Sequence, residues 1–245
     1  MAATVTGSNV IDASGGNGNT GATIDVPATT MLAIAFWCHW DSNGGSTLAT
    51  LTHNGASFTL QQLSEGAVSD ENGIGVGYLL NPTVADNQTI AWTWSAGGAR
   101  AEGGEIVVVW VTGAHATVPI RDRDNTAATD TTDVSLTIDS STTDLILAFC
   151  QNYVTGGPPV ADTTGSSEST FIDNGATNNH EYDVRSAVGA VTSTGISMTG
   201  EYYSAMSAVS IIVAAAGGSL SVNMVNRGGL LGPGGLAGVG GGLVA

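Results

Sequence analysis

The amino-acid sequence predicts an all-β protein, and three observations favour that class. Short apolar runs rich in β-branched and aromatic residues recur along the chain, and turn-forming pairs such as Asn-Gly and Gly-Gly separate them. No stretch of ten residues or more has the spacing of an amphipathic helix. Only 11% of the residues are charged, so Thr, Ser, Asn and Gly must supply the polar surface. We therefore expect a jelly-roll-like antiparallel β-sandwich, with a barrel as the second choice.

The expected strands follow one another at short intervals. They lie at 31–40, 75–80, 89–94, 105–111, 134–138, 144–150 and 208–215. The segment LTHNGASFTL predicts a hairpin, because Asn54-Gly55 suits a two-residue type I′ turn. Trp92 and Trp94 share one face of their strand, since strand side chains alternate. Core packing is the expected role of these rings and of Trp37 and Trp110, with a carbohydrate-stacking platform as the alternative.

The two halves of the sequence resemble each other. Residues 29–40, TTMLAIAFWCHW, match residues 142–153, TTDLILAFCQNY, and three further strand-like runs follow each segment in the same order. We expect one sandwich domain, residues 1–216, assembled from pseudo-repeated halves at about 23–113 and 133–214, with a chance similarity among β-strands as the alternative. Residues 217–245 are then an extended C-terminal arm rich in Gly and Leu.

Charge and composition argue against several partners. The chain has 21 acidic residues, five Arg and no Lys, and its formal net charge is −16. Binding to nucleic acid or to anionic membranes needs clustered Lys and Arg, so neither is expected. The first ten residues lack the features of a signal peptide, which predicts synthesis in the cytoplasm. Cys38 and Cys150 are then expected as buried free thiols, with a disulfide between them as the alternative.

No motif predicts catalysis, so we expect neither an enzyme nor a cofactor. The sequence lacks the G-x-S-x-G elbow, a C-x-x-C pair and the H-E-x-x-H motif, although His180-Glu181 begins like the last of these. A pair of carboxylates of the glycosidase kind is an open alternative among the 21 acidic residues.

One acidic stretch, DRDNTAATDTTD at 122–133, is a weak calcium candidate. Its carboxylates fall at positions 1, 3, 9 and 12 of a calcium-loop spacing, at Asp122, Asp124, Asp130 and Asp133. Ala127 stands where the sharp turn of such a loop needs Gly, and the flanking segments resemble strands. The favoured interpretation is a solvated acidic loop without metal.

Three segments, at Asn54-Gly55, Leu79 to Pro82 and Gly113 to Pro119, lie within a similarity that spans about residues 30–125. Through these segments the chain resembles β-sandwich proteins encoded by tailed phages and prophages. Such proteins also end in Gly- and Leu-rich tails after an Arg-Gly-Gly, as here at Arg227. The resemblance implies a structural virion protein, made in the host cytoplasm, that binds the major capsid protein or another virion protein.

Within that group, a capsid decoration protein that forms a homo-oligomer, with a trimer assumed, is the favoured interpretation. The alternative is a tail or fibre accessory protein that binds a host glycan or receptor. Trp40, at the loop edge in CHWDSNGG, is the candidate glycan contact.

The last twenty residues, NRGGLLGPGGLAGVGGGLVA, are the expected assembly interface. Nine of them are Gly, which lets a backbone pass close to a neighbour, and apolar side chains lie between the glycines. The contact residues are expected to be Arg227, Leu230, Leu231, Pro233, Leu236, Val239, Leu243 and Val244. Folding of this arm onto its own sandwich is the alternative.

Overall fold

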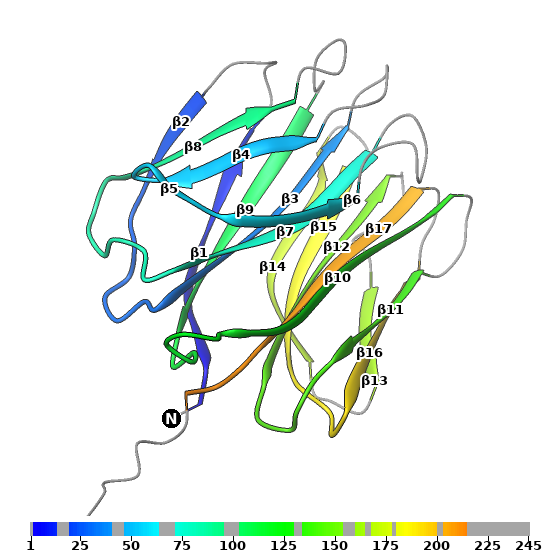
Figure 1. The fold of residues 1–245 in the computed structure, drawn as a ribbon. Coiled ribbons are helices and arrows are strands. Elements are labelled where there is room, and N and C mark those ends of the chain that lie inside the picture. The colour runs from blue at the N-terminus through cyan, green and yellow to red at the C-terminus, as the bar shows by residue number, and fades with distance from the viewer. Residues whose placement is uncertain are drawn as a thin grey trace, which may run out of the picture.

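The all-β prediction is confirmed by a computed structural model of the chain. It describes residues 2–13, 20–40, 47–63, 72–95, 103–129, 134–153, 160–164, 168–177, 180–199 and 203–214. Every regular element in these ranges is a β-strand, and all paired strands are antiparallel (Figure 1).

The strands form four sheets, which we number I to IV. Sheet I has the order β2-β8-β4-β5: β2 (Thr20–Ile24), β8 (Gln88–Trp94), β4 (Leu48–His53) and β5 (Ala56–Ser57). Sheet II has the order β1-β9-β3-β7-β6: β1 (Thr4–Asp12), β9 (Gly103–Thr112), β3 (Leu32–Trp40), β7 (Asn72–Leu80) and β6 (Thr59–Leu63). Sheet III has the order β10-β17-β12-β15-β14: β10 (Ile120–Thr129), β17 (Tyr203–Ile211), β12 (Leu145–Tyr153), β15 (His180–Val188) and β14 (Glu168–Thr177). Sheet IV has the order β11-β16-β13: β11 (Val134–Asp139), β16 (Ser193–Thr199) and β13 (Val160–Thr164).

The four sheets stack as successive layers, and a hydrophobic cluster fills each space between them (Figure 1). Trp37, Trp92 and Trp110 belong to the cluster between sheets I and II. Phe36 and Phe149 belong to the cluster between sheets II and III. The middle strands, β3 of sheet II and β12 of sheet III, have buried apolar residues on both faces because each of these sheets is covered on both sides.

The predicted strands and the predicted hairpin are confirmed, with a shift at the last strand. His53 pairs with Ala56, and Asn54 and Gly55 have φ angles of 48° and 82°, as a type I′ turn requires. The last strand, expected at 208–215, is β17 and ends at Ile211, where its pairing with Leu145 at the start of β12 also ends.

The expectation of an acidic loop from Asp122 is wrong over residues 122–129. This segment belongs to β10 and pairs with β17 throughout, because cross-strand pairing outweighs the low strand propensity of Asp. The carboxylates bond to neighbouring backbone: Asp122 accepts from the N–H of Arg123 at 2.9 Å and of Asp139 at 2.8 Å.

Sheets II and III contact each other through matched aromatic rings and one cation. The Phe36 and Phe149 rings stack, with centroids 5.7 Å apart and planes 10° apart. At the edge, the guanidinium of Arg123 lies 5.2 Å from the ring centroid of Tyr78 and donates to the carbonyl of Thr59 at 2.7 Å. Burial lowers the pKa of Arg123. The two halves of the chain therefore share one core.

Candidate functional site

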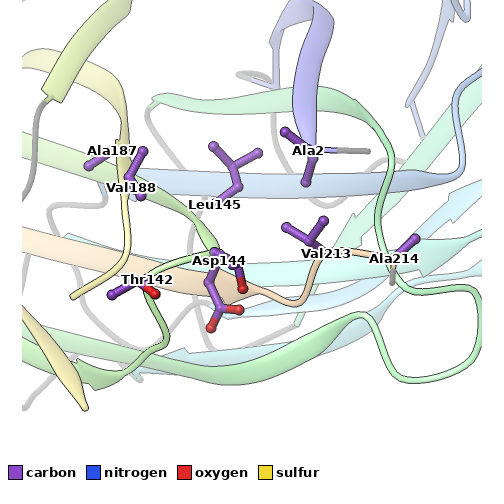
Figure 2. Close-up of a pocket in the computed structure, with 10 residues that line it drawn as sticks. Ala2, Thr142, Asp144, Leu145, Ala187, Val188, Val213 and Ala214 are labelled. Atoms are coloured by element: carbon purple, nitrogen blue, oxygen red, sulfur yellow. The ribbon is translucent and has the colours of Figure 1, made fainter. Parts of the chain in front are cut away.

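A pocket of about 500 Å³ lies at the end of the molecule where β1 begins and β17 ends (Figure 2). Four parts of the chain line it: Ala2 and Ala3, residues 142–145, the end of β15 at Ala187 and Val188, and the segment after β17 at Val213 and Ala214. Most of this lining is apolar, and Asp144 is its one ionisable residue. Val188 is 49% exposed, so the pocket opens to the surface.

A tight turn positions Asp144 at the start of β12. Its backbone N–H donates to the carbonyl of Ser141 at 2.8 Å, and its carboxylate accepts from the N–H of Ser141 at 2.9 Å. This side-chain bond closes the turn over Thr142 and Thr143 in the way that Asp commonly does.

The Asp144 carboxylate is an ion-paired group that is sealed from solvent. Arg121 donates to it from Nε at 2.5 Å and from Nη2 at 3.2 Å, and the Ser210 hydroxyl donates at 3.0 Å. The Asp144 side chain is fully buried and that of Arg121 is 36% exposed. Hydrogen bonding to Asp144 raises the pKa of Arg121.

A β-bulge places Arg121 beside this carboxylate. Ile120 pairs with Ile211 and Asp122 pairs with Ser210, which leaves Arg121 as the extra residue of β10. Bulges bend a strand and re-aim its side chains. The resulting ion pair joins β10, β12 and β17 at the base of the pocket.

This arrangement suits binding of an apolar group better than acid–base chemistry. The carboxylate oxygens of Asp144 already accept four hydrogen bonds, so they are not free to take a proton from a substrate. Because Arg121 neutralises the carboxylate, an apolar occupant would not face an unpaired buried charge.

The structure describes two of the four calcium-candidate residues. Asp122 and Asp124 lie two residues apart on β10, while Asp130 and Asp133 lie outside the described residues. Over the part of the chain that the structure describes, no three His, Cys, Asp or Glu side chains gather into a possible metal site.

The remaining sequence predictions have different outcomes. Trp37, Trp92, Trp94 and Trp110 are at most 4% exposed, which confirms core packing. The Trp40 side chain and all the arm residues from Arg227 to Val244 lie outside the described residues. Cys38 and Cys150 form no disulfide and lie buried in different hydrophobic clusters, so the disulfide alternative is wrong. Burial raises the pKa of the Cys38 thiol, which lowers its reactivity.

Sequence reasoning missed the Arg121–Asp144 pair and the pocket above it. One signal was present: Asp144 directly precedes an apolar run at the position where the first half has Met31. A carboxylate next to a buried strand needs a partner, but nothing local indicates that Arg121 is that partner.

No family model, curated protein or solved structure matches this chain at a significant level. In the described ranges, no helix has the length and apolarity to cross a membrane.

Proposed function

We propose that this chain is a structural protein of a tailed-phage particle, most specifically a capsid decoration protein. Its body consists of two tandem jelly rolls, and its C-terminal arm holds it to a neighbouring subunit or to the shell. The observation that carries the proposal is the strand order that the two halves share.

Strand order supports a jelly roll in each half. We count β5 and β6 as one strand that crosses between sheets, and renumber the strands from β1 to β9 in chain order as 1 to 8. Sheet II then has the order 1-8-3-6-5 and sheet I has the order 2-7-4-5. Counted from β10, sheet III has 1-8-3-6-5 and sheet IV has 2-7-4. Two four-stranded sheets, 1-8-3-6 and 2-7-4-5, make up an eight-stranded jelly roll built from two Greek keys.

Two details favour a duplication. In β1, Val5 pairs with Val111 and Gly7 pairs with Trp110, so Thr6 is an extra, bulged residue. Arg121 is the bulged residue at the corresponding position of β10. Phe36 and Phe149 occupy matching positions in the two aligned segments and stack on each other. We therefore propose complete repeats at 4–112 and 120–211, in place of one jelly roll completed by two half-sandwiches.

The fold supports a virion function by analogy with other jelly-roll proteins. Jelly rolls recur in viral capsid and lectin domains, although a fold alone does not determine a function. The resemblance of residues 30–125 to phage β-sandwich proteins and the Gly-rich arm both favour the virion over a lectin. The net charge of −16 is compatible with an outer surface away from the packaged genome.

The test is the composition of purified particles of the phage or prophage that encodes the chain. Mass spectrometry should find the chain at a fixed copy number per particle, and labelled antibody should place it on the head. A chain that is absent from particles would overturn the proposal. If the full-length chain enters particles and a chain ending at residue 225 enters equally well, the proposed role of the arm is wrong.

A further inference from the structure

The pocket is suited to an uncharged, apolar occupant. Its apolar lining includes Leu145, Val188 and Val213, and its one carboxylate is neutralised by Arg121. Val188 remains 49% exposed although it packs at the end of a buried sheet, so the pocket leaves apolar surface uncovered.

The chain itself runs directly from this pocket into an uncharged segment. Ala214, the last described residue, is part of the lining. Residues 215–225, AAGGSLSVNMV, contain no charged side chain. Gly217, Gly218 and Ser219 are strong turn formers, so the chain can reverse direction within a few residues of Ala214.

The residues after this turn alternate like a strand with one apolar face. Leu220, Val222 and Met224 fall on one face, and Ser221 and Asn223 fall on the other. Leu220 is six residues from Ala214, which an extended chain spans in about 20 Å. Backbone partners are also near, because β1 is an edge strand of sheet II and Ala2 and Ala3, just before it, line the pocket.

We propose that the pocket binds residues 219–225 of its own chain, with the Leu220 side chain inserted beside Val188 and Val213. In this arrangement Leu220 covers apolar lining of the pocket at Val188, which is 49% exposed in the described residues. The inference does not depend on the virion proposal, because it concerns residues 219–225, which precede the proposed assembly interface at residues 226–245.

Disulfide trapping in the full-length chain tests the proposal. In the double variant Val188→Cys, Leu220→Cys, mild oxidation should form a disulfide within one molecule, since the two Cα atoms must lie within about 7 Å. Mass spectrometry of a proteolytic digest identifies the bond, and a non-reducing gel shows whether the product is a monomer. The native Cys38 and Cys150 are buried, and the single variants check that they do not react.

The matched control pairs Leu220→Cys with Val10→Cys. Val10 is 50% exposed but lies on β1 seven residues from Ala3, far along the strand from the pocket. Equal trapping at Val10 and Val188, or no trapping at Val188, would overturn the proposal. A linked dimer whose yield rises with protein concentration would also overturn it, because the occupant would then be the arm of a second copy.

A pair of charge substitutions provides a second readout. Leu220→Asp should lower the thermal midpoint by roughly 4–8 °C, because it removes a buried Leu and places a charge against apolar lining. Ser221→Asp adds the same charge on the opposite face of the segment and should leave the midpoint unchanged. Equal effects of the two substitutions would contradict insertion of Leu220.

Discussion

Gln151 is a buried polar residue whose hydrogen-bonding groups lack partners among the described residues. Its side chain is 1% exposed, and both Nε2 and Oε1 are unpaired there. An unsatisfied buried polar atom costs roughly 1–3 kcal/mol of folding free energy. Gln62 differs from Gln151 in having a hydrogen-bond partner, because its Oε1 accepts from the N–H of Leu48 at 3.1 Å.

We predict that Gln151→Met stabilises the protein by about 1–3 kcal/mol, because Met has a similar volume and no polar group to satisfy. Gln62→Met should instead destabilise it by about 1 kcal/mol, since it removes a hydrogen bond that is made. Urea denaturation of both variants gives the two free energies of unfolding. Destabilisation by Gln151→Met would show that the amide has partners beyond those described.

His53 is held neutral in the core between sheets I and II. It is 1% exposed, its Nε2 has no partner among the described residues, and its ring lies 6.0 Å from that of Trp110 at an angle of 63°. Burial lowers the pKa of His53. The unfolded chain, with an ordinary His pKa near about 6.5, therefore binds a proton more readily than the folded chain.

We predict that this residue makes folding weaken under mild acid. The contribution of neutral His53 to stability is complete above about pH 6.5 and is progressively lost as the pH falls below that value. In His53→Leu, the loss of stability between pH 7.5 and pH 5 should be smaller than in the unmodified chain. Denaturation midpoints across this range measure it, and parallel pH profiles for the two proteins would contradict the prediction.

At the scale of the element, Trp37 on β3 packs over two glycines of β7. A Cβ placed on Gly75 would lie 2.1 Å from Cζ2 of Trp37 and 2.8 Å from the carbonyl oxygen of Gln61. The alternation of Gly and apolar residues in GIGVGY thus leaves room for an indole ring between sheets I and II.

We predict that Gly75→Ala destabilises the protein by about 1–3 kcal/mol or more, because neither the backbone nor the packed ring can move aside freely. The control is Gly21→Ala on β2, where the nearest atom would lie at an ordinary contact distance of 3.5 Å. Its effect should stay within about 0.5 kcal/mol. Thermal and urea unfolding of the two variants test the difference, and equal effects would contradict this packing.

At the scale of the whole molecule, sheets II and III bury one hydrophobic cluster that both halves of the chain share. The cluster that joins them includes Ile34, Phe36 and Val109 from the first half and Phe149 and Val209 from the second. Exposing either sheet alone would uncover a large apolar face. The halves are thus expected to unfold in a single transition.

We predict that Phe36→Ala and Phe149→Ala each cost about 3–5 kcal/mol. Because the two rings stack, the double variant should cost less than the sum, with a coupling of roughly 0.5–3 kcal/mol. Calorimetry should also show one transition in each protein. Strict additivity, or two separate transitions, would indicate that the halves fold independently.

Local signals in the sequence were sufficient for the strand class and most of the strands. Apolar runs such as 105–111 and the Asn54-Gly55 turn identify β9 and the β4–β5 hairpin without reference to distant residues. β10 was missed because its Asp residues disfavour strands locally, and only its pairing with β17 stabilises it. β1 was missed because it is an edge strand with just one fully buried residue, Ile11.

The sequence by itself determined that the protein is all-β, acidic and rich in tight turns, and that Trp37, Trp92, Trp94 and Trp110 pack in the core. The tertiary structure alone decided the stack of four sheets, the separation of Cys38 from Cys150 and the pocket above Asp144. The reason is the sequence separation over which each interaction acts. Alternation and turn chemistry act over a few residues, whereas Arg121 bonds to Asp144 across 23 positions. Ala3 and Val213 line one pocket only after both halves of the chain have folded.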